Sequence, residues 1–158
     1  MPISMRDVLQ SLLLGLCACC SGMAMAGGPV TWTFAAKPAG NDTVQLLLTA
    51  TCEQGWHIYA LALPSDEGPL PTMVQVEPQA AFRLVGAPLE PKPVEAFDPN
   101  FGVAVRYHDG AITITQPLLR KTAQAFPVEG AVEYMACNDK TCLPPRTVTF
   151  TVDVPRSK

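Results

Sequence analysis

The stretch around Cys137 and Cys142 constrains the fold more than any other part of the sequence. The residues before it, 131–136, are typical of a strand. After it, the apolar residues of 148–154 alternate with threonine and aspartate with a period of two. Between the two runs lie turn-forming residues and then a Pro-Pro pair, which cannot continue a central strand. We therefore predict that two antiparallel strand ends bring the cysteines close enough for a disulfide across the mouth of a hairpin.

The rest of the chain predicts an all-β domain. Sixteen prolines and eleven glycines accompany short alternating runs, and no helical periodicity is sustained. Further strands are expected at 30–34, 44–52, 55–60, 74–76, 82–85, 103–107 and 111–115, with 108–110 as a hairpin turn and 121–130 as a connection. About eight short strands with such turn signals favour a two-sheet β-sandwich.

The first 26 residues have the pattern of a secretory signal peptide. Arg6 gives a thin positive region, residues 8–20 are apolar, and Ala24-Met25-Ala26 is a small-x-small cleavage site. The apolar run is too short to span a bilayer comfortably. Cys19 lies in a loose lipobox pattern, so a lipid anchor at this residue is the alternative. Residues 27–158 are then expected to form one exported domain.

Charge and hydropathy exclude two classes of partner for the mature chain. The full sequence has a net charge of −3, which is not basic enough for a nucleic-acid-binding domain. Beyond the signal peptide, no stretch is apolar over enough residues to predict a transmembrane helix.

Cysteine counting leaves an odd number in the mature domain. Three of the six cysteines, Cys17, Cys19 and Cys20, belong to the signal segment. Cys52 falls on the apolar positions of the alternating run 44–52, so a buried, inert thiol is expected there. Cys137 and Cys142 remain as the pair available for exchange.

Three kinds of chemistry are compatible with this pair. A loop this short makes a weak staple, because the chain-entropy model assigns it only about 2 kcal/mol. A turn-borne pair that opens without unfolding a sheet suits thiol–disulfide exchange, with Lys140 and Arg146 as modest promoters of a thiolate. A structural disulfide and a metal site are the alternatives.

The run Tyr-Met-Ala-Cys-Asn-Asp-Lys-Thr-Cys-Leu-Pro-Pro at 134–145 resembles the active-site hairpin of the N-terminal periplasmic domain of DsbD. The resemblance extends upstream to Gly55–Tyr59 and Asp98–Phe101, and so covers nearly the whole mature chain. It implies an immunoglobulin-like β-sandwich that passes electrons from a membrane partner to periplasmic thiol proteins.

The resemblance also implies roles for individual residues. Cys142 would form the mixed disulfide with a partner, and Cys137 would resolve it. Phe101 would cap the disulfide from the loop that starts at Asp98, with Tyr59 lining the site. A core position is the alternative for Phe101, and Phe97 is then the substitute cap.

The function expected from these features is that of a periplasmic thiol–disulfide oxidoreductase working as a reductant. Its donor would be a separate membrane thiol reductase, since the chain ends at Lys158. Its clients would be periplasmic thioredoxin-like or disulfide-containing proteins, with no organic cofactor. The alternatives are a non-catalytic immunoglobulin-like binding module and an envelope copper protein that uses His57 and Met135 with the cysteines. His108 is expected to lie solvated in a turn.

Overall fold

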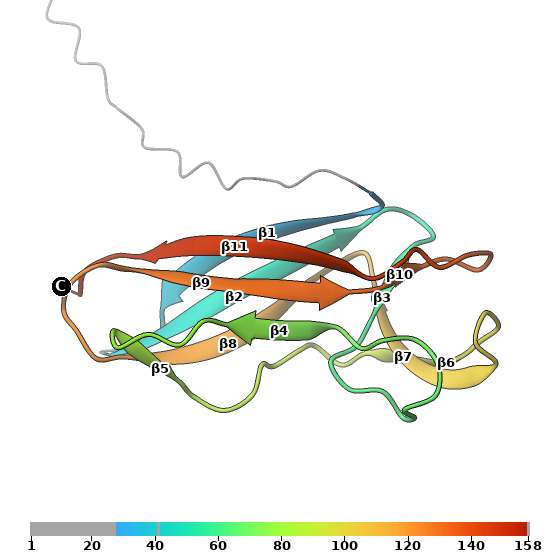
Figure 1. Cartoon of the computed structure of the whole chain (residues 1–158), viewed down its shortest axis with the longest axis horizontal. Coiled ribbons are helices and arrows are strands. Elements are labelled where there is room, and N and C mark those ends of the chain that lie inside the picture. The colour runs from blue at the N-terminus through green and yellow to red at the C-terminus, as the bar shows by residue number, and fades with distance from the viewer. Residues whose placement is uncertain (1–27, 41, 158) are drawn as a thin grey trace, which may run out of the picture.

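A computed structural model describes residues 28–40 and 42–157, and in these ranges the chain forms eleven strands and no helix (Figure 1). The signal segment and Cys19 lie outside the described residues. The strands are β1 (Val30–Pro38), β2 (Thr43–Cys52), β3 (His57–Tyr59), β4 (Met73–Val76), β5 (Phe82–Leu84), β6 (Val94–Asp98), β7 (Val103–Asp109), β8 (Ala111–Arg120), β9 (Phe126–Tyr134), β10 (Ala136–Cys137) and β11 (Arg146–Val154).

Hydrogen bonds divide the strands into three antiparallel sheets. The first has the order β1-β2-β8-β5 and the third the order β11-β9-β4, and these two form the layers of the sandwich (Figure 1). The second, with the order β10-β3-β7-β6, lies at the end of the molecule away from the last residues of β11. The expected all-β, immunoglobulin-like sandwich is confirmed, with the strands at one end separated into a sheet of their own.

The main core lies between the first and third sheets. Along β2, Leu46, Leu48 and Ala50 are fully buried, as the alternating pattern predicts. Aromatic contacts join the layers, because Phe34 of β1 stacks on Phe150 of β11 with ring centroids 4.7 Å apart. Full burial of a leucine or phenylalanine side chain stabilises a fold by about 1.5–3 kcal/mol.

The second sheet has apolar residues on both faces. Ile58 of β3 and Ala136 of β10 pack into the main core. Their neighbours Tyr59 and Cys137, together with Val105 of β7, form a second small buried cluster. Successive strand residues point to opposite faces, so this cluster lies on the face turned away from the main core. The cysteine pair therefore belongs to a packing unit separate from the sandwich interior.

Two sequence predictions of connectivity are wrong. Residues 103–107 and 111–115 do not form a hairpin, because β7 pairs with β3 and β6 whereas β8 pairs with β2 and β5. The turn at Gly110, where φ is +61°, instead carries the chain from the second sheet to the first. The predicted connection 121–130 is also partly strand, since β9 begins at Phe126 and buries Phe126 and Val128.

Candidate functional site

The cysteine pair closes a tight turn in the connection between β9 and β11. Cys137 and Cys142 form a disulfide with Cα atoms 4.1 Å apart. The Asn138 side chain shapes the turn: its Oδ1 accepts hydrogen bonds from the backbone N–H groups of Lys140 and Thr141, each at 2.9 Å. Asparagine favours this geometry because its side chain mimics a backbone turn. The prediction of a turn-borne disulfide is confirmed, although Cys137 pairs with His57 of β3 and not with β11.

The two sulfur-bearing residues differ in exposure. Cys137 is fully buried in the second cluster, whereas Cys142 is half-buried at its edge. Attack on a disulfide requires access to one sulfur. In this arrangement an incoming thiol therefore reaches Cys142 before Cys137.

Tyr59 and Asp98 form a hydrogen-bonded pair beside Cys142. The Tyr59 hydroxyl donates to Asp98 Oδ2 at 2.5 Å and lies 3.9 Å from Cys142 Sγ. Burial raises the pKa of Tyr59, and the hydrogen bond and charge of Asp98 raise this pKa further. The hydroxyl therefore stays protonated and connects the thiol position to a carboxylate. The structure brings together three residues that the sequence placed in the site.

The loop from Asp98 to Gly102 folds over this pair. Asp98 Oδ1 accepts a hydrogen bond from the Asn100 backbone N–H at 2.8 Å, and the Gly102 N–H donates to the Asp98 carbonyl at 2.7 Å. Phe101 packs against Tyr59 with ring centroids 6.3 Å apart, and it belongs to the cluster around Cys137. Phe97 is 68% exposed, and that cluster does not include it. Phe101 is thus the aromatic residue that the loop holds near the disulfide.

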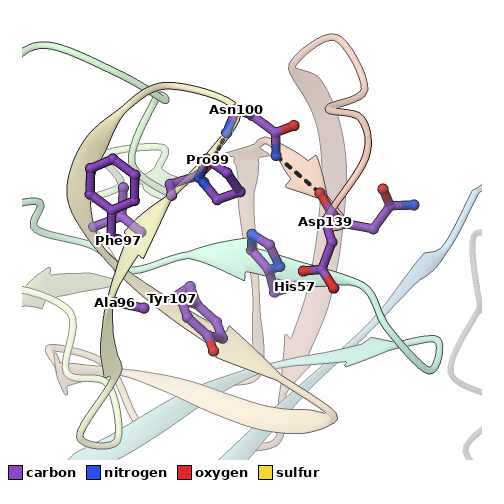
Figure 2. Close-up of a pocket in the computed structure, with 10 residues that line it drawn as sticks. His57, Ala96, Phe97, Pro99, Asn100, Tyr107 and Asp139 are labelled. Carbon is purple, nitrogen blue, oxygen red and sulfur yellow. Dashed lines mark hydrogen bonds between the residues drawn. The ribbon is translucent and has the colours of Figure 1, made fainter.

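Sequence reasoning missed a contact between this loop and the cysteine turn. The Asn100 side-chain amide donates to the Asn138 carbonyl at 3.0 Å (Figure 2). Asn138 directly follows Cys137, so the loop is tied to the hairpin that carries the disulfide. A turn-forming asparagine gives no signal for such a partner, because the contact depends on the tertiary fold.

His57 lies on the same face of the second sheet as Cys137 and Tyr59. Its ring contacts Tyr107 at a centroid distance of 4.7 Å and Tyr59 at 5.3 Å. Burial lowers the pKa of His57, against an opposing effect from Asp98, Asp139 and Asp109. Its Nε2 is buried and has no hydrogen-bond partner among the described residues. Neutral His57 is therefore a polar group in the site whose hydrogen-bonding capacity is unused. Trp56 instead packs against the main core.

Two other titratable residues of the sequence analysis lie away from the disulfide. Cys52 is buried and unpaired among the described residues, and burial followed by the charge of Asp109 raises its pKa to about 11. The predicted burial of this thiol is confirmed, and its inertness stays a prediction. The prediction for His108 is wrong: it lies in β7, is buried, and its Nε2 is 3.0 Å from Glu90 Oε2.

Two further features of the described residues bear on the metal-site and membrane alternatives. Within residues 28–40 and 42–157, no group of three or more His, Cys, Asp or Glu side chains is arranged to hold a metal ion. The same part of the chain contains no helix with the length and hydropathy needed to cross a bilayer.

Comparisons with known proteins identify a family and several similar solved structures. The family model described as "Thiol:disulfide interchange protein DsbD, N-terminal" matches residues 28–154. The N-terminal periplasmic domain of ScsB from Proteus mirabilis is similar with a TM-score of 0.51 and 14% identity, over 80% of this chain and 47% of that chain. The reduced DsbD N-terminal domain of Neisseria meningitidis gives a TM-score of 0.48 and 18% identity, over 75% and 81%.

A complex between the DsbD N-terminal and PilB N-terminal domains from Neisseria meningitidis is also similar, with a TM-score of 0.46 and 18% identity, over 75% of this chain and 80% of that chain. No curated protein matches the sequence. The family model covers most of the described residues, including both cysteines and the Asp98–Gly102 loop. This chain therefore belongs to the family of DsbD N-terminal domains, which is named for thiol–disulfide interchange.

Proposed function

We propose that this chain is a periplasmic thiol–disulfide oxidoreductase that relays electrons through reversible oxidation of Cys137 and Cys142. The observation that carries the proposal is the half-buried Cys142 sulfur next to the Tyr59 hydroxyl, in a disulfide that closes only a short turn. Such a disulfide is accessible from one side and contributes little to stability. Both properties suit a bond that opens and closes in each cycle.

In the reducing direction, the Cys142 thiolate attacks one sulfur of a partner disulfide. A mixed disulfide forms, and the partner's other sulfur leaves as a thiolate. The Cys137 thiolate then attacks Cys142 Sγ, forming the Cys137–Cys142 bond and releasing the partner's second sulfur. The partner gains two electrons and, on protonation, two protons, and this domain loses the same. A membrane thiol reductase restores the dithiol by the reverse exchange.

Tyr59 and Asp98 give the Cys142 proton a route. In the dithiol form, the Cys142 S–H donates to the Tyr59 oxygen while the Tyr59 hydroxyl donates to Asp98. A concerted shift of both protons leaves a Cys142 thiolate, a neutral tyrosine and a protonated Asp98. The 2.5 Å contact between Tyr59 and Asp98 supports this route. No free tyrosinate is required, in agreement with the raised pKa of Tyr59.

Phe101 acts as the cap in this proposal. Its position against Tyr59 and in the cluster around Cys137 supports a role in excluding small thiols from the disulfide. Gly102, with φ at +71°, allows the loop to turn sharply after the aromatic residue. Partners would be periplasmic thioredoxin-like or disulfide-containing proteins that displace Phe101 on docking.

The reduction potential of the cysteine pair tests the proposed function. Equilibration with glutathione redox buffers, followed by mass spectrometry of alkylated protein, measures it. A value in the range of about −180 to −270 mV is expected for exchange. A value below about −300 mV would indicate a structural disulfide, and the binding-module alternative would then replace this proposal.

Trapping identifies the partners. A Cys137→Ala variant keeps Cys142 but lacks the resolving thiol, so mixed disulfides should accumulate and be released by dithiothreitol. Cys142→Ala is the matched control, because its remaining sulfur is the buried one. Equal capture by both variants would contradict the assignment of Cys142 as the attacking sulfur.

A further inference from the structure

A cavity lies beside the disulfide turn on the same face of the second sheet. Its volume is about 100 Å³, and residues of β3, β6, β7, the Asp98–Gly102 loop and the cysteine turn line it. One water occupies about 10–15 Å³ of such a cavity volume. The cavity therefore has the space of several waters, which is enough for a side chain. In Figure 2, Pro99, His57, Tyr107 and Asp139 surround it.

The charged groups of the cavity all have one sign. Asp98 and Asp139 line it, and no lysine or arginine among the described residues does. Asp98 already accepts from Tyr59 and Asn100, but the exposed Asp139 carboxylate makes no ion pair with any described residue. The charges of the nearby aspartates raise the pKa of His57, as a negative local potential does. The larger effect of burial lowers this pKa overall. The cavity thus offers an unpaired carboxylate and an imidazole with unused hydrogen-bonding capacity.

The remaining walls suit a long side chain with an apolar stem. Ala96, Val105 and the ring of Tyr107 provide apolar surface, and Tyr107 packs against His57. Lysine and arginine cover such surface with their methylene groups while keeping the charged end near water. A cation close to an aromatic face gains further attraction from the ring.

We propose that this cavity receives a lysine or arginine side chain of the protein with which the domain exchanges disulfides. The cationic group would lie near Asp139, and its stem would lie against Ala96 and Tyr107. Asn138 and Asp139 line the cavity and directly follow Cys137, so a partner side chain bound there would contact the turn that carries the disulfide. This inference rests on the proposed function and adds a rule for partner selection. Complementary charge orients an encounter and raises its rate.

Peptide disulfides of defined charge test the proposal. Reduced protein is mixed with cystine peptides that carry one Lys, Gln or Glu at each of the three positions on either side of the cysteine. At one or more positions, the Lys peptide should react about fivefold faster than the Gln peptide, the effect of one partly exposed charge pair. The Glu peptide should react more slowly than both.

Two variants locate the effect. Asp139→Asn should reduce the Lys-to-Gln rate ratio to below about twofold. Asp153→Asn removes the same charge from an exposed position next to the last residue of β11 and should leave the ratio unchanged. β11 ends on the side of the molecule away from the second sheet (Figure 1). Equal loss in both variants would assign the preference to net charge and overturn the proposal. A Lys-to-Gln ratio near one at every position in the unmodified protein would also overturn it.

A binding measurement separates this inference from the proposed function. If the Gln peptides do not react at all, the exchange function fails, and the cavity is judged on oxidised protein alone. The probe is then the Lys peptide with serine in place of cysteine, followed by NMR signals of the His57 ring. Shifts with this peptide, absent with its Glu counterpart and in Asp139→Asn, support the cavity as a cation site. Unchanged His57 signals overturn it.

Discussion

Reducing the Cys137–Cys142 disulfide should lower the free energy of unfolding by about 2 kcal/mol and leave the fold intact. The cysteines are five positions apart, and the chain-entropy model assigns a loop of this length about 2 kcal/mol at 25 °C. The turn also keeps its other bonds, because Asn138 still accepts from the backbone at Lys140 and Thr141. The main core does not contain either sulfur.

Urea unfolding of oxidised and dithiothreitol-reduced protein at pH 7, followed by tryptophan fluorescence, measures this difference. The midpoint should fall while the dependence on urea stays the same, since the surface exposed on unfolding is nearly unchanged. A variant with both Cys137→Ala and Cys142→Ala controls for effects of the reductant and should not respond. A loss above about 4 kcal/mol, or a changed urea dependence, would refute the idea that the turn is independent of the core and would favour a structural disulfide.

Phe101→Ala should raise the rate at which glutathione reduces the disulfide, with a stability loss below the ~3–5 kcal/mol of a fully buried phenylalanine, since Phe101 is half-buried; a large loss of stability with an unchanged rate would make it a core residue. Tyr59→Phe should slow exchange of the reduced protein below pH 8 and shift its pH profile upward, because the thiol loses its route to Asp98; an unchanged profile would exclude the relay. Native Cys52 should react with iodoacetamide at pH 8 at least about a hundredfold more slowly than in denaturant, because a pKa of about 11 leaves roughly one thiol in a thousand ionised. This raised pKa also means that folding keeps Cys52 protonated, so its contribution to stability is present below about pH 9 and is lost as pH rises through about 11; Cys52→Ala should flatten this alkaline decline in the unfolding midpoint.

Local sequence patterns were sufficient to predict a strand wherever one face of that strand is buried. Leu46, Leu48 and Ala50 alternate with polar residues, and a strand with one buried face must show this period. The cysteine turn was predictable for a similar reason, since Asn138 and the following prolines act on their own backbone neighbours. Such signals depend on residues close in sequence, so they can be read without knowledge of the tertiary fold.

Contacts between distant segments were not predictable in this way. The Gly110 turn indicates that the chain reverses, but it does not say that β7 and β8 enter different sheets. His108 lies in a sequence typical of a turn, yet Glu90 from a distant segment pairs with it and allows its burial. The bond from Asn100 to the Asn138 carbonyl likewise joins residues that no pattern connects.

The placement of the cysteines shows how a small sandwich could carry a bond that opens and closes in the proposed exchange. In β3, Ile58 faces the main core while Tyr59 faces the disulfide. In β10, Ala136 faces the main core and Cys137 lies on the opposite face. The backbone of these two short strands therefore holds the site in position through residues that take no part in the chemistry. The contacts that a change of redox state would disturb lie on the face away from the main core, where Tyr59, Val105 and Phe101 belong to one cluster with Cys137. The order of apolar and reactive residues along the two strands thus keeps the main core apart from the disulfide, so that opening the bond should cost only the about 2 kcal/mol of the short loop.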